Sequence, residues 1–593
     1  MFRHTLTRRD AFLIVLGASS MQIWSLLLRE SLSDQSILIN AQFANHNHPA
    51  AADADVNGKH LMTNLLTMAA VTTATTTVTV TESVIPEPTQ DSDTLRAARE
   101  RDNREFPHTN IVAHAPGWTL FKNLYMSNGT LYILTPRPKT FPEIRMMTST
   151  GLAAENTREN IAAREPTSVN MDFITPDDAL DRWGGDLDVG QTNRVWTIEG
   201  NTLLFNDPSQ FLRHYYHLVA ELFFGVQAFW HGAFSEEETT IQEHTSQQLA
   251  FSASSTLHPA PPHIDRAIFA HSNADGWRDN PGFNSYFLRA AYPSLTIEHE
   301  EDWADRIKVT KDGDRVWRFP TVLLTDRSAA HRGRACGSLT QRTASEAWEG
   351  MRKLGKLRGR HVGGWWEPVR NAIWEFAGVP LHGRNTRDLQ AQVPEQDVVV
   401  RGFGEGSDEI LNGVGVEAQK YLPMPDKIVI SYISRQATRR RKLIQEQHDI
   451  LVDELKALVK RKNEEATKDE RKPKWYLDVL EAEKMTKDEQ VRAAAKTTIM
   501  LGVHGNGLTH LVWMKPTRVS TVIEMFYPDG FAHDYQWTSR ALGMAHFGVW
   551  NDTHFTHPNI PHVDYPEGFQ GNKIPIHGPT VAKLIEDRIE GVL

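Results

Sequence analysis

From residue 426 onward, short apolar runs alternate with segments of helical pattern. Strands that alternate with helices predict an α/β fold with a parallel sheet wound on both faces. Thr486 and Glu489 form a capping box at the start of one helix. The mixed-charge run 463–474 is expected to be a solvated insertion. The expected strands are 426–435, 497–503, 519–526 and 546–550, and the expected helices are about 439–461, 486–496, from 508 onward and 533–543.

The strand 497–503 ends in the turn His504-Gly505-Asn506-Gly507, and a helix follows. In doubly wound sheets, ligands sit at the carboxyl ends of the strands, where this turn lies. Glycine permits positive φ and close approach of another group to the backbone. Free amides at a helix N-terminus attract anions such as phosphate. The turn lacks the GxGxxG and P-loop patterns, which argues against a nicotinamide dehydrogenase or a simple NTPase.

The N-terminus predicts entry into the secretory pathway. Three arginines within residues 1–10 precede the uncharged segment 11–28, which is close to the ~20 residues that span a bilayer as a helix. Positive charge before the segment predicts a cytosolic tail, a transmembrane signal anchor and a lumenal body, that is, a single-pass type II protein. The alternative is a cleaved signal peptide with its cleavage region near 18–20.

The segment 29–104 is rich in Thr, Ser and Pro and cannot bury enough surface to fold alone. We expect it to be a disordered stem that holds the folded body away from the membrane. Folded sequence begins near Asn110, with short strands and a hairpin at Ser127-Asn128-Gly129. Asn128 and Asn551 also begin N-glycosylation sequons, which agree with a lumenal address.

The rest of the N-terminal half shows one long apolar helix pattern and two buried strands. We expect irregular insertions at 235–263 and 340–395. The expected helix is 205–230, starting after Asp207-Pro208, and the expected strands are 266–273 and 319–328.

Charge and cysteine content exclude several classes of protein. The net charge of −10 argues against a general nucleic-acid binder, which normally carries a basic excess. Cys336 is the only cysteine in the sequence, so neither an intrachain disulfide nor a CxxC zinc site can form. Two acidic pairs, Asp186-x-Asp188 and Asp312-x-Asp314, match the spacing with which some enzymes bind a divalent metal together with a diphosphate. Such short pairs arise by chance in acidic turns, and we expect no metal cofactor.

Three spaced blocks resemble glycosyltransferase family 61. The block "GVHGNGLTHLVWMKP…VIEMF" resembles its signature, "ISRQATRRRKL" (433–443) looks like its Ser-Arg element, and "RHYYHLVAELFFG" (213–225) looks like its His-x-x-x-acid helix. The family includes EGF-domain O-GlcNAc transferase, protein O-mannose N-acetylglucosaminyltransferase 2 and plant xylosyltransferases. The resemblance covers roughly 110–555, with long unmatched insertions, and "PGWTLFKNLYMSNGTLYILT" looks like the start of a fungal branch.

The resemblance implies a GT-B architecture, in which two Rossmann-like domains face a cleft. It also implies an inverting, metal-independent transfer from a nucleotide sugar bound to the C-terminal domain. The implied boundaries are an acceptor-side domain at 105–424, a nucleotide-sugar domain at 425–555, and a C-terminal tail and helix at 556–593.

Several residues are candidates for binding the donor. Arg435, with either Arg440 or Arg441, is expected to grip the diphosphate leaving group, since guanidinium groups bind phosphate oxygens in pairs. The glycine turn is expected to complete the anion site, and Glu524 to accept hydrogen bonds from ribose hydroxyls. The turn residues proposed as donor contacts are His504, Gly505, Asn506, Gly507, Leu508 and Thr509.

An inverting transfer also needs a base for the proton of the acceptor hydroxyl. His217 and Glu221 lie four residues apart on a predicted helix and so share a face, with His214 three residues before His217. The carboxylate either acts as the base itself or orients His217 and raises its pKa. The assignment between these two roles stays open.

The sequence thus predicts a Golgi or ER membrane glycosyltransferase that uses a UDP-sugar, with N-acetylglucosamine and xylose as the leading sugars. The expected acceptor is a hydroxyl of a protein or of a cell-surface polysaccharide, and no nucleic-acid partner is expected. Two alternatives remain: a catalytically silent lumenal binding protein of the same fold, and a metal-dependent transferase that EDTA would inactivate.

Overall fold

The computed structural model describes residues 106–155, 157–186, 189–234, 261–330, 342–354, 356–357, 363–380 and 422–593. All of them belong to one compact unit, residues 89–593. The predicted cytosolic tail, signal anchor and stem lie outside the described residues, as do Cys336 and Asp188. Within the described ranges, no helix has the length and apolar character needed to cross a membrane.

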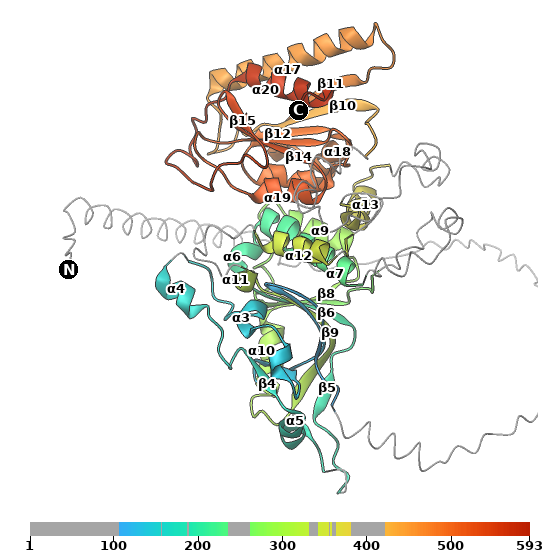
Figure 1. Ribbon diagram of the computed structural model, residues 1–593, viewed down its shortest axis with the longest axis vertical. Helices are drawn as coiled ribbons and strands as arrows, with labels where there is room; N and C mark the ends of the chain where they lie inside the picture. The colour runs from blue at the N-terminus through green and yellow to red at the C-terminus, as the bar shows by residue number, and fades with distance from the viewer. Residues whose placement is uncertain are drawn as a thin grey trace, which may run out of the picture. The chain divides into compact units, whose positions relative to one another are not determined.

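Nine strands in the described part of the chain form a mixed N-terminal sheet (Figure 1). Their order is β4-β3-β2-β9-β6-β7-β8, with β1 paired to β2 and β5 paired to β9. The expected strands at 266–273 and 319–328 are confirmed as β7 and β9. The bounds are β1 Asn110–Ala115, β2 Trp118–Ser127, β3 Thr130–Leu134, β4 Met171–Ile174, β5 Val195–Thr197, β6 Asn201–Pro208, β7 Arg266–His271, β8 Thr296–Glu298 and β9 Val316–Thr325.

The predicted hairpin joins β2 to β3. Ser127 pairs with Thr130 across the turn. Asn128 and Gly129 both have positive φ, 49° and 81°, as a two-residue hairpin turn of type I′ requires. The hairpin prediction is therefore confirmed, and the turn leaves the sequon residue Asn128 exposed. The second sequon residue, Asn551, is half-buried and also has positive φ.

Helices of the N-terminal half cover this sheet and its connections. The longest of them pack against the parallel strands or against the second sheet. Their bounds are η1 Pro138–Thr140, α3 Ile144–Met147, α4 Arg158–Ala163, α5 Pro176–Trp183, α6 Ser209–Leu212, η3 Tyr216–Phe223, α7 Phe224–Ala233, α9 Phe283–Ala291, α10 Glu300–Val309, α11 Arg327–Ala330, α12 Arg342–Lys353, η5 Gly364–Trp366 and α13 Glu367–Phe376.

Strands β8, β7, β6 and β9 lie side by side in parallel. The connections β6–β7 and β7–β8 run through η3, α7 and α9, whose residues share a core with Phe205 and Phe269. The connection β8–β9 runs through α10, whose Trp303 shares a core with Leu204. Neighbouring residues of a strand point to opposite faces, so the crossovers change face between β6 and β9. This change marks a switch point, where ligands bind in such sheets.

The expected single helix over 205–230 is interrupted. Strand β6 continues through Pro208, which still pairs with His271 in β7. The short helix α6 then ends near Arg213, and a π-helix, η3, precedes the α-helix α7. Wider turns of this π type are rare and occur frequently at functional sites.

Six strands of the described residues form the C-terminal sheet, in the order β11-β10-β12-β13-β14-β15. All pairs are parallel except β14–β15. The predicted doubly wound parallel sheet is confirmed. Strands β12 and β13 are buried throughout, as their unbroken apolar runs predict. The bounds are β10 Lys427–Ile433, β11 Lys474–Leu480, β12 Ile499–Val503, β13 Thr521–Met525, β14 Ala545–Trp550 and β15 Thr553–Phe555.

Helices cover both faces of this sheet. Residues of α17 and α20 pack on one face, where Figure 1 shows the two helices together. Residues of α18, η7 and α19 pack on the other. Strand β11 lies on one side of β10 and the later strands on the other, so the switch point falls between β10 and β12. The bounds are α17 Gln445–Ala466, η6 Ala482–Lys484, α18 Lys487–Lys496, η7 Asn506–Trp513, α19 Asp534–Ala541 and α20 Gly578–Glu590.

Two predictions in this half need correction, and one is confirmed. Helix α17 begins at Gln445 rather than near Arg439, because the preceding loop pairs with a distant one. The run 463–474 is not a single solvated insertion: the helix extends to Ala466, and the edge strand β11 begins at Lys474. The capping box of Thr486 and Glu489 is present at the start of α18.

One continuous core contacts both sheets. It contains residues of η3, α7 and α12 together with residues of α13, α18, η7 and α19. Trp366 and Trp374 donate their indole N–H groups to the carbonyls of Val512 and Trp513, at 2.9 and 2.8 Å. These bonds fix the helices of the N-terminal half against the segment that follows the glycine turn.

Candidate active site

Strands β10 and β12 are neighbours in the C-terminal sheet, and their carboxyl ends lie side by side. Ile433, the last residue of β10, pairs with Gly502 in β12. Arg435 follows β10, and His504 follows β12. Both residues therefore lie at the switch point of the sheet.

Two guanidinium groups converge on Gly505. A Cβ atom at this position would lie 3.0 Å from Nη1 of Arg435 and 3.3 Å from Nη1 of Arg441. Gly505 has a φ of 151°, which residues with side chains rarely adopt. The absence of a side chain leaves room for both arginines. The structure thus places Arg435 beside the glycine turn.

Gly507 has a different reason to be glycine from the one expected. It is not among the glycines with positive φ. Instead, a Cβ atom here would lie 2.8 Å from Cγ2 of Ile433. Gly507 therefore allows the turn to lie close against the end of β10.

The side chain of Arg435 makes no hydrogen bond or ion pair with any described residue, and its Nε is buried without a partner. Burial lowers the pKa of Arg435 from its ordinary value. An unsatisfied buried donor costs about 1–3 kcal/mol, and more when it is charged. A bound anion would offset this cost.

Arg441 is held in place by its loop. It has a φ of 60°, unusual for a residue other than glycine, and its N–H donates to the carbonyl of Gly571 at 2.7 Å. Its Nε donates to Oε1 of Gln570 at 2.6 Å, and its Nη1 donates to the carbonyl of His504 at 3.3 Å. Arg440 is exposed. Of the two candidates, Arg441 is therefore the one placed at the turn.

His504 and Glu524 form a buried network with His546. Nδ1 of His504 and Oε1 of Glu524 share a hydrogen bond of 2.5 Å, and Nε2 of His546 and Oε2 of Glu524 share one of 2.8 Å. Burial, followed by Asp534, raises the pKa of Glu524 well above its ordinary value. Burial, followed by the nearby Arg441, lowers the pKa of His504 well below its ordinary value, so its ring is neutral at pH 7.

This network changes the roles expected for both residues. Glu524 is fully buried with both oxygens hydrogen-bonded to histidines, which argues against the expected contact with a ribose. Nδ1 of His504 is bonded to Glu524, so this ring nitrogen is not available to a phosphate. His504 instead accepts from Arg441 through its carbonyl, and Glu524 orients it.

The amides of the turn differ in availability. Those of Gly505, Asn506 and Gly507 make no hydrogen bond to any residue that the structure describes. The amide of Leu508 donates to the carbonyl of Gly505 at 3.0 Å, as in a 3₁₀-helix. The anion site can therefore draw on three amides, without the expected contribution of Leu508.

Asn506 and Thr509 connect the turn to the π-helix. Oδ1 of Asn506 accepts from the backbone N–H of Tyr216 at 3.2 Å and from Oγ1 of Thr509 at 3.3 Å. Tyr216 also donates its hydroxyl to the carbonyl of Asp534 at 2.8 Å. These two side chains of the turn thus serve to position η3, which carries His217 and Glu221.

The predicted pair on η3 is in direct contact. Nδ1 of His217 donates to Oε2 of Glu221 at 2.5 Å. The side chain of His217 is 22% exposed, whereas that of Glu221 is fully buried. A hydroxyl from solution can therefore reach His217 but not Glu221. The geometry favours His217 as the base and Glu221 as the group that orients it.

Arg327, two residues after the end of β9, contacts Glu221 as well. Its Nη1 donates to Oε2 of Glu221 at 2.7 Å, and its Nε donates to Oδ1 of Asp207 at 3.2 Å. Burial alone would raise the pKa of Glu221, but Arg327 and His217 together hold it below its ordinary value. Glu221 is therefore ionised at pH 7.

His214 and Asp534 bring the two groups into one electrostatic environment. The rings of His214 and His217 lie 4.8 Å apart. Burial, His217 and Arg441 all act to lower the pKa of His214, which falls to about 3. Burial, followed by Glu221, raises the pKa of Asp534 to about 7. Through His214, the residues around His217 and Glu221 therefore interact electrostatically with Arg441 at the glycine turn.

The acidic pairs do not form a shared metal site among the described residues. Asp188 is not described, so the pair with Asp186 is untested. Asp314 is bound instead by Arg194 at 2.8 Å and by Arg315 at 3.1 Å. No group of three or more potential ligand residues is found in the ranges that the structure describes.

Sequence reasoning missed Arg327, Asp207, Asp534 and His546. For two of these residues, the position in the sequence near the end of a predicted strand could have indicated a functional role. Asp207 lies at the carboxyl end of β6 and Arg327 two residues after β9, which are neighbouring parallel strands, and the carboxyl ends of such strands gather functional residues. Asp534 and His546 carried no distinctive pattern, because single polar residues at strand and helix starts are common.

Two α/β sheets, with a cationic edge beside a histidine–carboxylate pair, are consistent with an α/β glycosyltransferase. Residues 372–523 match the model of the family Glycosyltransferase 61. This match supports the predicted resemblance to glycosyltransferase family 61 over these residues. The match includes Arg435, Arg441 and the whole glycine turn. A search of curated proteins found no match, and the fungal branch stays a prediction.

Proposed function

We propose that this protein is an inverting glycosyltransferase that transfers a sugar from a UDP-sugar to an acceptor hydroxyl without a metal ion. The observation that carries the proposal is the unpartnered guanidinium of Arg435, which meets Arg441 at Gly505. Both arginines lie in the region matched to the family. The switch point of a parallel sheet is also where nucleotides bind in folds of this type.

The arginines act on the leaving group. As the glycosidic bond breaks, its electron pair stays on the diphosphate oxygen, and the new charge needs stabilisation. Arg435 and Arg441 supply two positive charges, and the amides of Gly505, Asn506 and Gly507 supply further donors. Hydrogen bonds to charged groups contribute about 1.5–3 kcal/mol each. In this proposal these groups do what a divalent cation does in metal-dependent enzymes.

His217 acts on the acceptor. Its Nδ1–H is committed to Glu221, so Nε2 carries the lone pair that accepts the proton of the attacking hydroxyl. The hydroxyl oxygen bonds to the anomeric carbon as the bond to the diphosphate breaks on the opposite side, which inverts the configuration. Ionised Glu221, held by Arg327, stabilises the imidazolium that forms.

The identity of the sugar and the acceptor, the roles of the two domains and the cellular location are proposed from the sequence and from the resemblance to the family. The leading sugars are N-acetylglucosamine and xylose, and the acceptor is a protein or cell-surface polysaccharide. The two sheets act as the donor and acceptor domains of a GT-B enzyme. The N-terminal segment anchors the protein in the Golgi or ER membrane, with the body in the lumen.

The proposal is tested by screening nucleotide sugars for slow hydrolysis by the purified protein, with and without EDTA. We expect one UDP-sugar to be hydrolysed at the same rate in both conditions, and the His217→Gln variant to bind UDP but lose this activity. Activity that EDTA abolishes would reject the metal-independent mechanism. UDP binding with no turnover of any sugar nucleotide would favour the catalytically silent alternative.

A further inference from the structure

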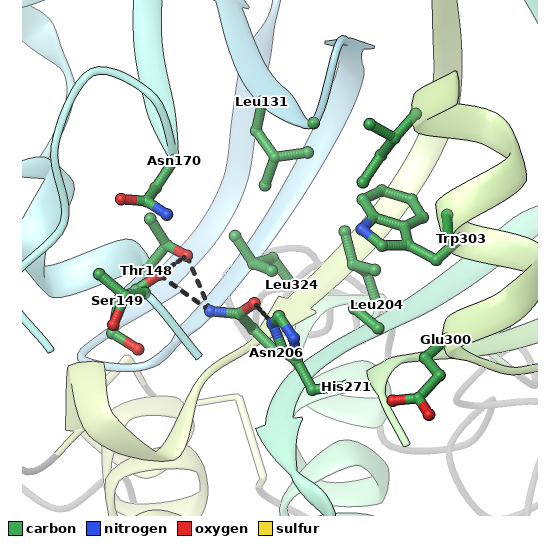
Figure 2. Close-up of a pocket in the computed structure, with 15 residues that line it drawn as sticks. Leu131, Thr148, Ser149, Asn170, Leu204, Asn206, His271, Glu300, Trp303 and Leu324 are labelled. Atoms are coloured by element: carbon green, nitrogen blue, oxygen red, sulfur yellow. Dashed lines mark hydrogen bonds between the residues drawn. The ribbon is translucent and has the colours of Figure 1, made fainter. Parts of the chain in front are cut away.

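A cavity of about 260 Å³ lies against the N-terminal sheet, and none of the candidate active-site residues lines it (Figure 2). It opens at the carboxyl ends of β6 and β7 and is bordered by α10. Leu204 and Leu324 in its wall belong to the face of the sheet opposite to the face that packs against η3. The volume is close to the ~300 Å³ at which small-molecule sites begin.

A rigid polar network forms one side of the cavity. Nδ2 of Asn206 donates to Oδ2 of Asp326 at 2.7 Å and to the carbonyl of Ser149 at 3.0 Å. Because these contacts take the amide nitrogen, Oδ1 of Asn206 accepts from Nε2 of His271 at 2.8 Å. Nδ1 of His271 therefore carries a lone pair. Figure 2 shows Asn206 and His271 joined in this way.

Four polar groups of the lining have no partner among the described residues. Nε1 of Trp303 and Nδ2 of Asn170 are free donors, while Nδ1 of His271 and the carboxylate of Glu300 are free acceptors. In Figure 2 the indole nitrogen of Trp303 faces the middle of the cavity. Two donors and two acceptors thus face a space whose wall also contains aliphatic side chains and the polar residues Thr148, Ser149, Thr150 and Asn206.

This lining selects among ligand classes. It contains no Lys or Arg and includes one carboxylate, which disfavours an anion. The free polar groups disfavour a purely apolar ligand, because each would lose its hydration. A sugar ring carries hydroxyls that both donate and accept, together with C–H groups that pack on leucine and tryptophan. A neutral sugar therefore matches both halves of the lining.

We propose that the cavity binds a neutral saccharide unit of the acceptor, so that the acceptor is a glycan; this rests on the proposed function. The strand ends provide a physical connection to the candidate base. Asn206 lines the cavity and donates to Asp326. Their chain neighbours are Asp207 and Arg327, and Arg327 donates to both Asp207 and Glu221. The carboxyl ends of β6 and β9 thus support both the cavity and the pair of His217 and Glu221.

The test uses the full chain and saturation-transfer NMR with methyl glycosides of mannose, xylose, galactose and glucose. We expect at least one to bind. Glu300→Gln and Trp303→Phe should each weaken it about 5–10-fold, the effect of one lost hydrogen bond. The matched control is Glu301→Gln, an exposed carboxylate on the same turn of α10 that does not line the cavity. It should bind the glycoside as the wild type does.

Two outcomes would overturn the cavity as a saccharide site: no binding of any glycoside, or equal binding by the two cavity variants and the wild type. Turnover tests the acceptor role. The bound glycoside should raise consumption of the donor sugar above hydrolysis, and an unchanged rate would reject that role. UDP binding measured on the same samples reports on the donor site separately, so failure of the proposed function is distinguishable from failure of this inference.

Discussion

Nη1 of Arg435 lies 3.0 Å from the position that a Cβ atom would occupy at Gly505. The arginine and the glycine come from the ends of two neighbouring strands, and each constrains the other. The guanidinium can lie over the turn only because residue 505 has no side chain. The predicted anion site depends on this pairing.

Replacing Gly505 with alanine is therefore expected to weaken UDP binding by at least tenfold and to lower stability by about 1–3 kcal/mol. The new methyl group would displace Arg435, and the φ of 151° would be strained. Calorimetry with UDP and thermal melts would measure the two effects. Gly313→Ala is the control, since Gly313 has a φ of 73° and no atom within 4 Å of its Cβ position. This control variant should lose stability but bind UDP with the affinity of the wild type. Unchanged UDP affinity in Gly505→Ala would argue against the site.

Glu221→Gln should abolish turnover and leave UDP binding intact. The neutral amide cannot stabilise the imidazolium of His217, and general-base catalysis contributes about 10²–10⁴-fold. Stability should fall by about 2–3 kcal/mol, less than the 3–5 kcal/mol typical of a broken buried pair, because Arg327 keeps Asp207. Single-turnover kinetics and urea melts would measure both. A variant with normal turnover would exclude Glu221 from the mechanism.

The lowered pKa of Glu221 also predicts a pH dependence of stability. The unfolded carboxyl titrates near 4.5 and the folded one below that value. The stabilisation is therefore complete above about pH 4.5 and is lost as the pH falls through the folded pKa. Urea melts between pH 3 and 6 should show a smaller acid-induced loss in Glu221→Gln than in the wild type. Parallel curves would contradict this assignment.

Asp534 should contribute to the pH dependence of stability with the sign opposite to that of Glu221, and Asp534→Asn tests this. The carboxyl titrates near 3.8 when unfolded and near 7 when folded, so the folded protein binds the extra proton between these values. Stability from this residue therefore decreases as the pH rises from about 4 to 7. The asparagine variant should be more stable than the wild type at pH 8, on the order of 1–4 kcal/mol, and nearly equal at pH 4. A variant that is less stable at pH 8 would refute the raised pKa.

Glu524→Gln distinguishes an orienting role from a ribose contact. Both oxygens of Glu524 are hydrogen-bonded to histidines, so the substitution should disturb His504 and weaken UDP and 2′-deoxy-UDP by the same factor. Calorimetric titrations of wild type and variant with both nucleotides would complete a double-difference cycle. If the variant lost affinity for UDP but not for 2′-deoxy-UDP, the result would indicate that Glu524 contacts the 2′-hydroxyl of the ribose and would contradict a purely orienting role.

The C-terminal sheet could be predicted because its strands are buried on both faces and therefore read as unbroken apolar runs. Strand β11 was missed because it is an edge strand: Trp475 is buried while Tyr476 is exposed, and a charged segment precedes it. The π-helix could not be predicted, since its residues have the same apolar pattern as an α-helix. Its register depends on contacts with Asn506 and Asp534, which are distant in sequence.

The candidate site was predicted in part for the same reason. Arg435, His504 and the glycines stand next to strand ends, so their position followed from the order of the elements. The choice of Arg441 over Arg440 depends on a loop that pairs with Gly571, and no local pattern indicates that contact. The role of Glu221 depends on Arg327, which is over a hundred residues away in sequence. Long-range pairings of this kind require the folded structure.

The central claim is that Arg435 binds the diphosphate of a nucleotide sugar, and calorimetric titration of UDP tests it most directly. Arg435→Ala should weaken UDP binding by at least tenfold, about 1.4 kcal/mol, with an unchanged or higher melting temperature because no protein partner is lost. Arg440→Ala, which removes an exposed arginine from the same loop, should bind UDP as the wild type does. Equal UDP affinity in Arg435→Ala and wild type would contradict the account.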